Sequence, residues 1–250
     1  MLLAQLPAPV GQRRPRGGPP IEVYNVEKAW GGADFLMPLT QSDDREVRDD
    51  AVRALGRLED PRLVLPLLAL PNISPGSKST AIAQSLKGFD PAVDPRLVQT
   101  AFEWLSNHGS LPLNQKTVGD VATVAMPLGR IQYSTPEQVH KAESVILKIL
   151  NFTAADFRHA PTYEMAMRAF ESLARVNTRV TALDEDTVAR LDKAVGRANR
   201  NDSATVRFHA LAALINGRGL SDDTERVALK DEDWQVRRLA VTVLGGGGAG

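Results

Sequence analysis

The residues best able to do acid–base or metal chemistry in this sequence are four histidines, at His108, His140, His159 and His209. None has a second histidine four residues away, and no H-E-x-x-H segment is present. The chain also has no cysteine, which excludes disulfides, thiolate zinc sites, iron–sulfur clusters and thiol catalysis. We therefore predict no metal site and no cofactor.

The surroundings of these histidines favour structural interpretations. His108 and His159 fall where we predict loops, and His140 falls on an exposed helix face. His209 follows Phe208 and could face a binding surface, although a solvated histidine is the simpler interpretation. No G-x-S-x-G nucleophile motif occurs, and the glycine run at 245–248 lacks the Lys-Ser/Thr of a phosphate-binding loop. We predict no catalytic residue.

Composition narrows the class of partner. The 250 residues include 30 basic and 30 acidic side chains, so the net charge is +0 and no global field attracts nucleic acid. The longest apolar run, Leu63 to Leu70, contains Pro66 and is far shorter than the roughly 18 residues that span a bilayer. The sequence predicts a soluble globular protein without a membrane span.

The first twenty residues differ from the rest. They contain five prolines, no acidic residue and three arginines, Arg13, Arg14 and Arg16, which predicts a disordered basic arm over 1–20. The alternative is that residues 1–12 are the remnant of a secretory signal. The compartment therefore stays open between cytoplasmic and exported.

From Phe35 to Leu244 apolar residues recur at three- and four-residue spacing, which is typical of amphipathic helices. Only Ile21 to Val26 alternates as a strand would. We therefore predict an all-α domain over 21–250, built from helices of about ten to sixteen residues.

Three segments repeat one pattern: residues 44–58, 203–217 and 233–247. Aligned without gaps, they share a Val-Arg pair, a small residue and a leucine at fixed offsets. The Val-Arg pairs are Val47-Arg48, Val206-Arg207 and Val236-Arg237; the small residues are Ala51, Ala210 and Ala240; the leucines are Leu55, Leu214 and Leu244.

Weaker copies lie between these segments, at 127–131, at 172–176 and, most faintly, at 85–86. Another apolar-periodic segment precedes each of these three copies and the strong copy at 203–217; these segments are 62–70, 94–106, 136–150 and 184–198. The pattern predicts about six helical hairpins, each with a first helix A and a second helix B. One such hairpin cannot bury its own apolar stripe, so neighbouring hairpins must stack.

The pattern D-x-x-V-R-x-x-A-x-x-A-L-G resembles the second helix of HEAT repeats, especially the short bacterial form. This resemblance implies a right-handed α-solenoid. In that fold, we expect Asp43 or Asp44, Asp202, and Asp231 or Asp233 to cap the B helices. Arg48, Arg207 and Arg237 would pair with an acidic turn residue of a neighbouring repeat.

The stack would present a concave face of B helices, and binding residues would project from it. In the first copy the outward positions are Asp49, Arg53 and Arg57. Alignment transfers them to Met126 and Arg130, to Phe208, and to Arg238. We expect Trp234 to pack in the groove between the last two units. A mixed, mildly basic and partly apolar face suits protein or peptide partners, so we predict a non-catalytic binding scaffold.

Three alternatives come from resemblance. The segments RALGRLEDPRLVLPLL, ESLARVN and DEDWQVRRLAVTVL resemble the repeat arm of bacterial HEAT proteins that continue into a cyclophilin-type peptidyl-prolyl isomerase. This chain would then be the recruiting arm, and the isomerase's own pattern matches no position in it. Helical-repeat DNA glycosylases and phycobilin lyases are the other two, and the first needs a strongly positive surface. The apolar last helix predicts a chain truncated there, or an edge that docks onto another surface.

Overall fold

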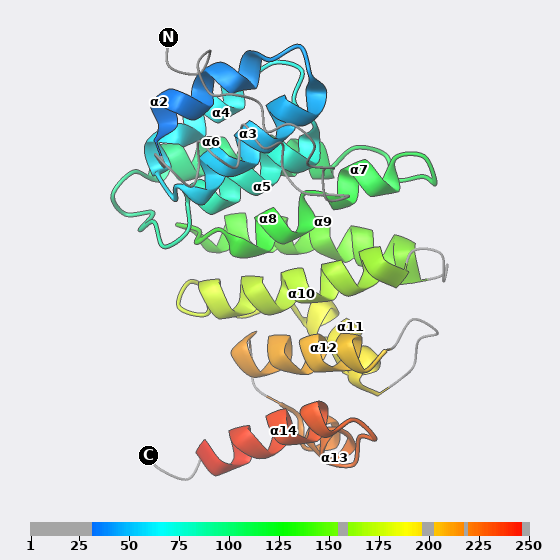
Figure 1. Ribbon diagram of the computed structural model, residues 1–250. Helices are drawn as coiled ribbons and strands as arrows, with labels where there is room; N and C mark the ends of the chain where they lie inside the picture. The colour runs from blue at the N-terminus through cyan, green and yellow to red at the C-terminus, as the bar shows by residue number, and fades with distance from the viewer. Residues whose placement is uncertain (1–31, 155–159, 197–202, 218–219, 247–250) are drawn as a thin grey trace, which may run out of the picture.

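The protein is described by a computed structural model that covers residues 32–154, 160–196, 203–217 and 220–246 (Figure 1). These residues form helices and no strand, which confirms the predicted all-α class. The first helices are α2 (Ala33–Leu36), the 3-10 turn η2 (Met37–Gln41), α3 (Arg45–Arg57), the 3-10 turn η3 (Pro61–Leu63), α4 (Val64–Ala69), α5 (Pro75–Ser85), α6 (Pro95–Gly109), α7 (Val118–Ala122) and α8 (Ala125–Arg130). They are followed by α9 (Pro136–Ala154), α10 (Ala160–Asn177), α11 (Glu185–Val195), α12 (Ala204–Gly217), α13 (Asp222–Leu229) and α14 (Trp234–Gly246).

Six of these helices form a row in which each packs on the next: α3, α5, α8, α10, α12 and α14 (Figure 1). They correspond to the predicted B helices. The predicted A helices α4, α6, α9 and α11 each pack against a member of that row, as does α13, which was not predicted. The chain thus runs from one end of the molecule to the other, with sequence neighbours also neighbours in space.

Some of the predicted features lie in parts of the chain that the structure does not describe. The basic arm, the strand at Ile21 to Val26, the cap at Asp202 and the loop at His159 lie outside the described residues. Leu244 belongs to α14, but its side chain also lies outside them.

Side-chain caps fix where several helices begin. Asp44 accepts the backbone N–H of Glu46 at 2.8 Å and opens α3, and Asp233 accepts that of Gln235 at 2.8 Å and opens α14. Asp94 caps α6 and Ser221 caps α13 in the same way. Such a cap is worth about 1 kcal/mol, so the Asp-before-helix pattern is a true boundary signal here.

The repeated pattern marks the core. The aligned alanines Ala51, Ala210 and Ala240 are each fully buried. Among the larger residues, Leu55, Val206, Leu214 and Val236 are at most 1% exposed, and Val47 packs half-buried against the same core. No helix in the described ranges combines the length and apolar character that a bilayer crossing needs.

Glycines let neighbouring B helices approach closely. A Cβ on Gly56 would lie 2.5 Å from the Cα of Ala81, where α3 crosses α5. A Cβ on Gly129, at the aligned position of α8, would collide with the backbone of Ala169 in α10. At these two junctions the glycine of the Leu-Gly pair is therefore required by the close approach of successive B helices.

Two expectations were wrong. Asp49 was expected to point outward, but it is buried and its carboxylate accepts the backbone N–H of Ser74 at 3.0 Å. His108 was expected in a loop, but it lies in the last turn of α6, where its ring stacks on that of Trp104 with centroids 5.6 Å apart.

Candidate functional site

A groove of about 490 Å³ lies between α12 and α14. Its walls come from residues one helical turn apart on the two helices, so both helices present one face to it. The lining residues are Thr205, Phe208, His209, Trp234, Gln235, Arg238, Leu239 and Thr242. Two residues predicted for the binding face, Phe208 and Arg238, are thereby brought together.

Aromatic side chains form the apolar part of the groove. The Trp234 side chain lines it, in the predicted region between the last two units, yet the residue is 57% exposed. Phe208 is half-buried and meets the His209 ring edge-to-face at 5.5 Å. A large exposed indole beside a half-buried phenyl ring is the kind of surface that anchors an apolar side chain of a partner.

The charged groups at the groove are Arg238 and the contact between His209 and the carboxylate of Glu171. Arg238 is exposed and makes no ion pair with the described residues. His209 Nδ1 lies 2.5 Å from a carboxylate oxygen of Glu171. The hydrogen bond from His209 lowers the pKa of Glu171, against the opposing effect of burial. The groove therefore offers one unpaired cation to a ligand.

A buried ion pair holds the helices that form the groove. Arg207 of α12 binds Asp231 in the turn before α14 through two hydrogen bonds, of 2.7 and 2.9 Å. Both side chains are at most 3% exposed. This confirms the predicted pairing of the repeat arginine with an acidic turn residue of the next unit.

The aligned arginines behave differently. Arg48 donates to the backbone carbonyls of Ser42 and Asp43, and Arg237 donates to those of Asp231 and Glu232. Each therefore closes the turn before its own helix, so for these two arginines the described contacts correct the expected pairing with a neighbouring unit.

The other predicted face residues lie on α3 and α8, away from the groove. Arg53 pairs with Asp50 and donates to the Ser77 hydroxyl at 2.8 Å, so its guanidinium is occupied in stacking α3 on α5. Met126 is half-buried against the core. Arg57 and Arg130 are exposed. The structure therefore unites only part of the predicted surface.

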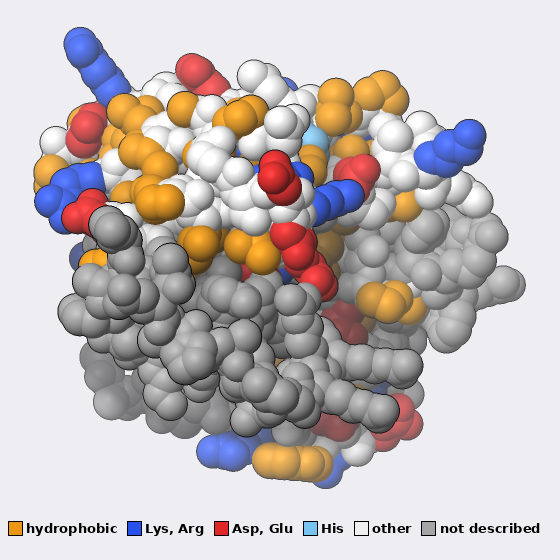
Figure 2. Space-filling model, turned by 45° about the horizontal axis from the view of Figure 1, so that its top comes forward, with side chains coloured by type: hydrophobic (Ala, Val, Ile, Leu, Met, Phe, Trp, Pro, Cys, Tyr) orange, Lys and Arg blue, Asp and Glu red, His pale blue; other side chains and the backbone are white. Residues whose placement is uncertain are grey.

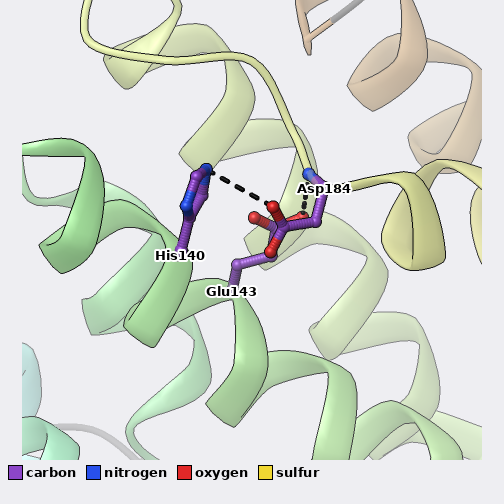
Figure 3. A group of neighbouring side chains, drawn as sticks. All are labelled: His140, Glu143 and Asp184. Carbon is purple, nitrogen blue, oxygen red and sulfur yellow. Dashed lines mark hydrogen bonds and ion pairs between the residues drawn. The ribbon is translucent and has the colours of Figure 1, made fainter.

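Sequence reasoning missed a second cluster, drawn in Figure 3. His140 and Glu143 of α9 and Asp184, just before α11, each place a ligand atom within 4.8 Å of the others. His140 and Glu143 are three residues apart on one helix face, a signal that was present in the sequence. Their third member, Asp184, comes from the next hairpin and carried no local signal.

A comparison with models of protein families gave no match for this chain, and a comparison with curated proteins found no relative.

Proposed function

We propose that this protein is a non-catalytic scaffold that binds a peptide segment of another protein in the groove between α12 and α14. We further propose that its helices form a right-handed solenoid of about six HEAT-like hairpins. The observation that carries the binding proposal is the groove itself, in which exposed Trp234 and unpaired Arg238 stand side by side along one wall.

The successive packing of the six B helices supports the solenoid, because in a repeat fold each unit contacts mainly its neighbours. The shared use of Arg48 and Arg237 to bind two preceding carbonyls also supports it. The same pattern of arginine–carbonyl hydrogen bonds in two turns far apart in the sequence is what a repeated unit produces.

The chemistry of the groove specifies the partner. Trp234 and Phe208 provide an apolar contact area, and Arg238 provides a planar donor that matches a carboxylate. Thr205, Gln235 and Thr242 supply polar groups at the rim. The expected ligand is a segment with one large apolar side chain and an Asp or Glu within a few residues of it.

On the face that Figure 2 shows, acidic and basic side chains are interspersed and neither sign forms a continuous patch. The net charge of +0 argues against the DNA-glycosylase alternative, which needs a positive surface. The alternative in which this chain recruits substrates for a larger isomerase stays a prediction, and it is compatible with the same groove.

The proposal is tested by selecting a displayed library of random twelve-residue peptides against the full chain. Enriched peptides should combine Trp, Phe or Leu with Asp or Glu, and fluorescence polarisation should show at least tenfold weaker binding to the Arg238→Glu and Trp234→Ala variants. The control is Arg96→Glu, a charge reversal on the exposed start of α6, which should bind as tightly as the wild type. Equal binding by all variants, or no enrichment, would overturn the proposal.

A further inference from the structure

The cluster at His140, Glu143 and Asp184 joins two hairpins. His140 and Glu143 lie on α9, which packs on α10, whereas Asp184 precedes α11, which packs on α12. His140 Nε2 lies 3.5 Å from Asp184 Oδ1, and Glu143 accepts the backbone N–H of Asp184 at 2.8 Å (Figure 3). Side chains from consecutive A helices therefore converge on one point.

One carboxylate oxygen in the cluster, Oε2 of Glu143, is buried without a hydrogen-bond partner of acceptable geometry among the described residues. Glu143 as a whole is 1% exposed. The neighbouring Thr187 hydroxyl is likewise buried without a hydrogen-bond partner of acceptable geometry in the part of the chain that the structure describes. A buried oxygen of this kind costs free energy unless a proton or a cation satisfies it.

Asp184 is the second unusual group. It occupies the N-cap position of α11, yet its side chain makes no capping hydrogen bond and turns toward His140 instead (Figure 3). An aspartate at this position ordinarily accepts an N–H of the first turn. Here that contact is forgone, and the carboxylate faces the imidazole.

The surroundings favour a cation. A cavity of about 430 Å³ adjoins the cluster and is lined by Glu143, Ser144, Leu147, Asp184, Glu185, Asp186 and Thr187. None of these lining residues is basic. The acidic first turn alone would be ordinary for a helix N-terminus. Two features distinguish this end of α11 from an ordinary helix start. Among the described residues, one oxygen of Glu143 has no hydrogen-bond partner, and the Asp184 side chain makes no capping hydrogen bond.

We propose that His140, Glu143 and Asp184 form a binding site for a divalent cation of the zinc type. Two ligand atoms on a tetrahedral zinc lie roughly 3.4 Å apart, given metal–ligand distances of about 2.0–2.1 Å. The separation of 3.5 Å between His140 Nε2 and Asp184 Oδ1 matches that edge. One imidazole and two carboxylates leave a fourth coordination position for water or another ligand, and the bound cation would connect the α9 and α11 hairpins.

The test is isothermal titration calorimetry, in which Zn²⁺ is added to the tag-free 250-residue chain after a chelator has removed bound metal. Co²⁺ substitution provides an independent optical signature of the ligand field. We expect one zinc ion per chain and a higher melting temperature with zinc. The variants His140→Gln, Glu143→Gln and Asp184→Asn should each weaken binding at least tenfold.

The matched control is His108→Gln, which removes a histidine of α6 that belongs neither to this cluster nor to the groove between α12 and α14. It should bind zinc as the wild type does. Circular dichroism of the metal-free variants separates loss of the site from loss of fold, and Glu143→Gln, which keeps the side-chain shape, should remain folded. No zinc uptake, or uptake that none of the three substitutions weakens, would overturn the proposal. Neither result depends on the peptide groove.

Discussion

Two junctions between successive B helices, α3 with α5 and α12 with α14, solve the same stacking problem differently. At the first, the buried Asp49 holds the Ser74 amide and Gly56 lies against the backbone of Ala81. At the second, Phe208 occupies the position aligned with Asp49, and its ring lines a groove. The stacking contact is instead made one residue earlier, by Arg207.

The comparison shows that the polar contact to the next turn is made from different positions of the repeat at the two junctions. When Arg207 provides it, the neighbouring position is released for another use. In α3 the aligned residue, Asp49, is buried and accepts the Ser74 amide, so its side chain is not available to a ligand. Substitutions at the two junctions should therefore change the free energy of unfolding by different amounts and for different physical reasons.

The largest effect is expected from Arg207→Met. Removing one partner of a buried ion pair leaves the buried Asp231 carboxylate without the Arg207 cation, which destabilises by about 3–5 kcal/mol. Urea unfolding followed by circular dichroism measures it. Arg48→Met, at the aligned position, removes only hydrogen bonds to backbone carbonyls and should cost about 1 kcal/mol. Equal losses would mean that the two junctions are not different.

Gly56→Ala should destabilise by about 2 kcal/mol, because the new Cβ forces α3 away from α5. The control is Gly119→Ala in α7, where nothing lies within 4 Å of the new carbon. That change should stabilise by about 0.5–1 kcal/mol through helix propensity. Thermal unfolding distinguishes the two signs, and a neutral Gly56→Ala would refute the close approach.

Asp49→Ala should cost about 1 kcal/mol or more, since it leaves the Ser74 amide without its acceptor. Asp49→Asn keeps an acceptor oxygen at the same place and should recover most of the loss. If the asparagine variant is as unstable as the alanine variant, the charge rather than the hydrogen bond is what matters.

The smallest expected effect is the loss of stability at low pH that comes from the His209–Glu171 contact. The His209–Glu171 contact lowers the folded-state pKa of Glu171 below its ordinary 4.5, so the pair stabilises the fold above that pH and the contribution is lost as pH falls through the folded-state value. Melting temperature against pH should fall less steeply below about pH 4.5 in Glu171→Gln than in the wild type. Identical slopes would show that the pair contributes nothing to stability.

The repeat register could be predicted from sequence because core positions obey a local periodicity. The buried alanines Ala51, Ala210 and Ala240, and the pairing of Arg207 with an acid of the next turn, follow from it. The partners of the polar side chains could not be predicted, because aligned residues such as Arg48 and Arg207 donate to different acceptors: Arg48 to the turn before its own helix and Arg207 to the turn before the next B helix.

The cluster around His140 escaped prediction for a related reason. Glu143 and His140 share a helix face, but Asp184 meets them only because one hairpin stacks on the next. The partial gathering of the predicted surface has the same origin: Phe208 and Arg238 meet across adjacent helices, whereas Arg53 is drawn into the α3–α5 junction.

The central claim is that the α12–α14 junction binds a peptide and the α3–α5 junction does not. Hydrogen–deuterium exchange of the full chain, with and without a library-selected peptide, tests it directly. The account predicts slower exchange in α12 and α14 on binding, with α3 and α5 unchanged. Protection confined to α3 and α5, or protection nowhere, would contradict it.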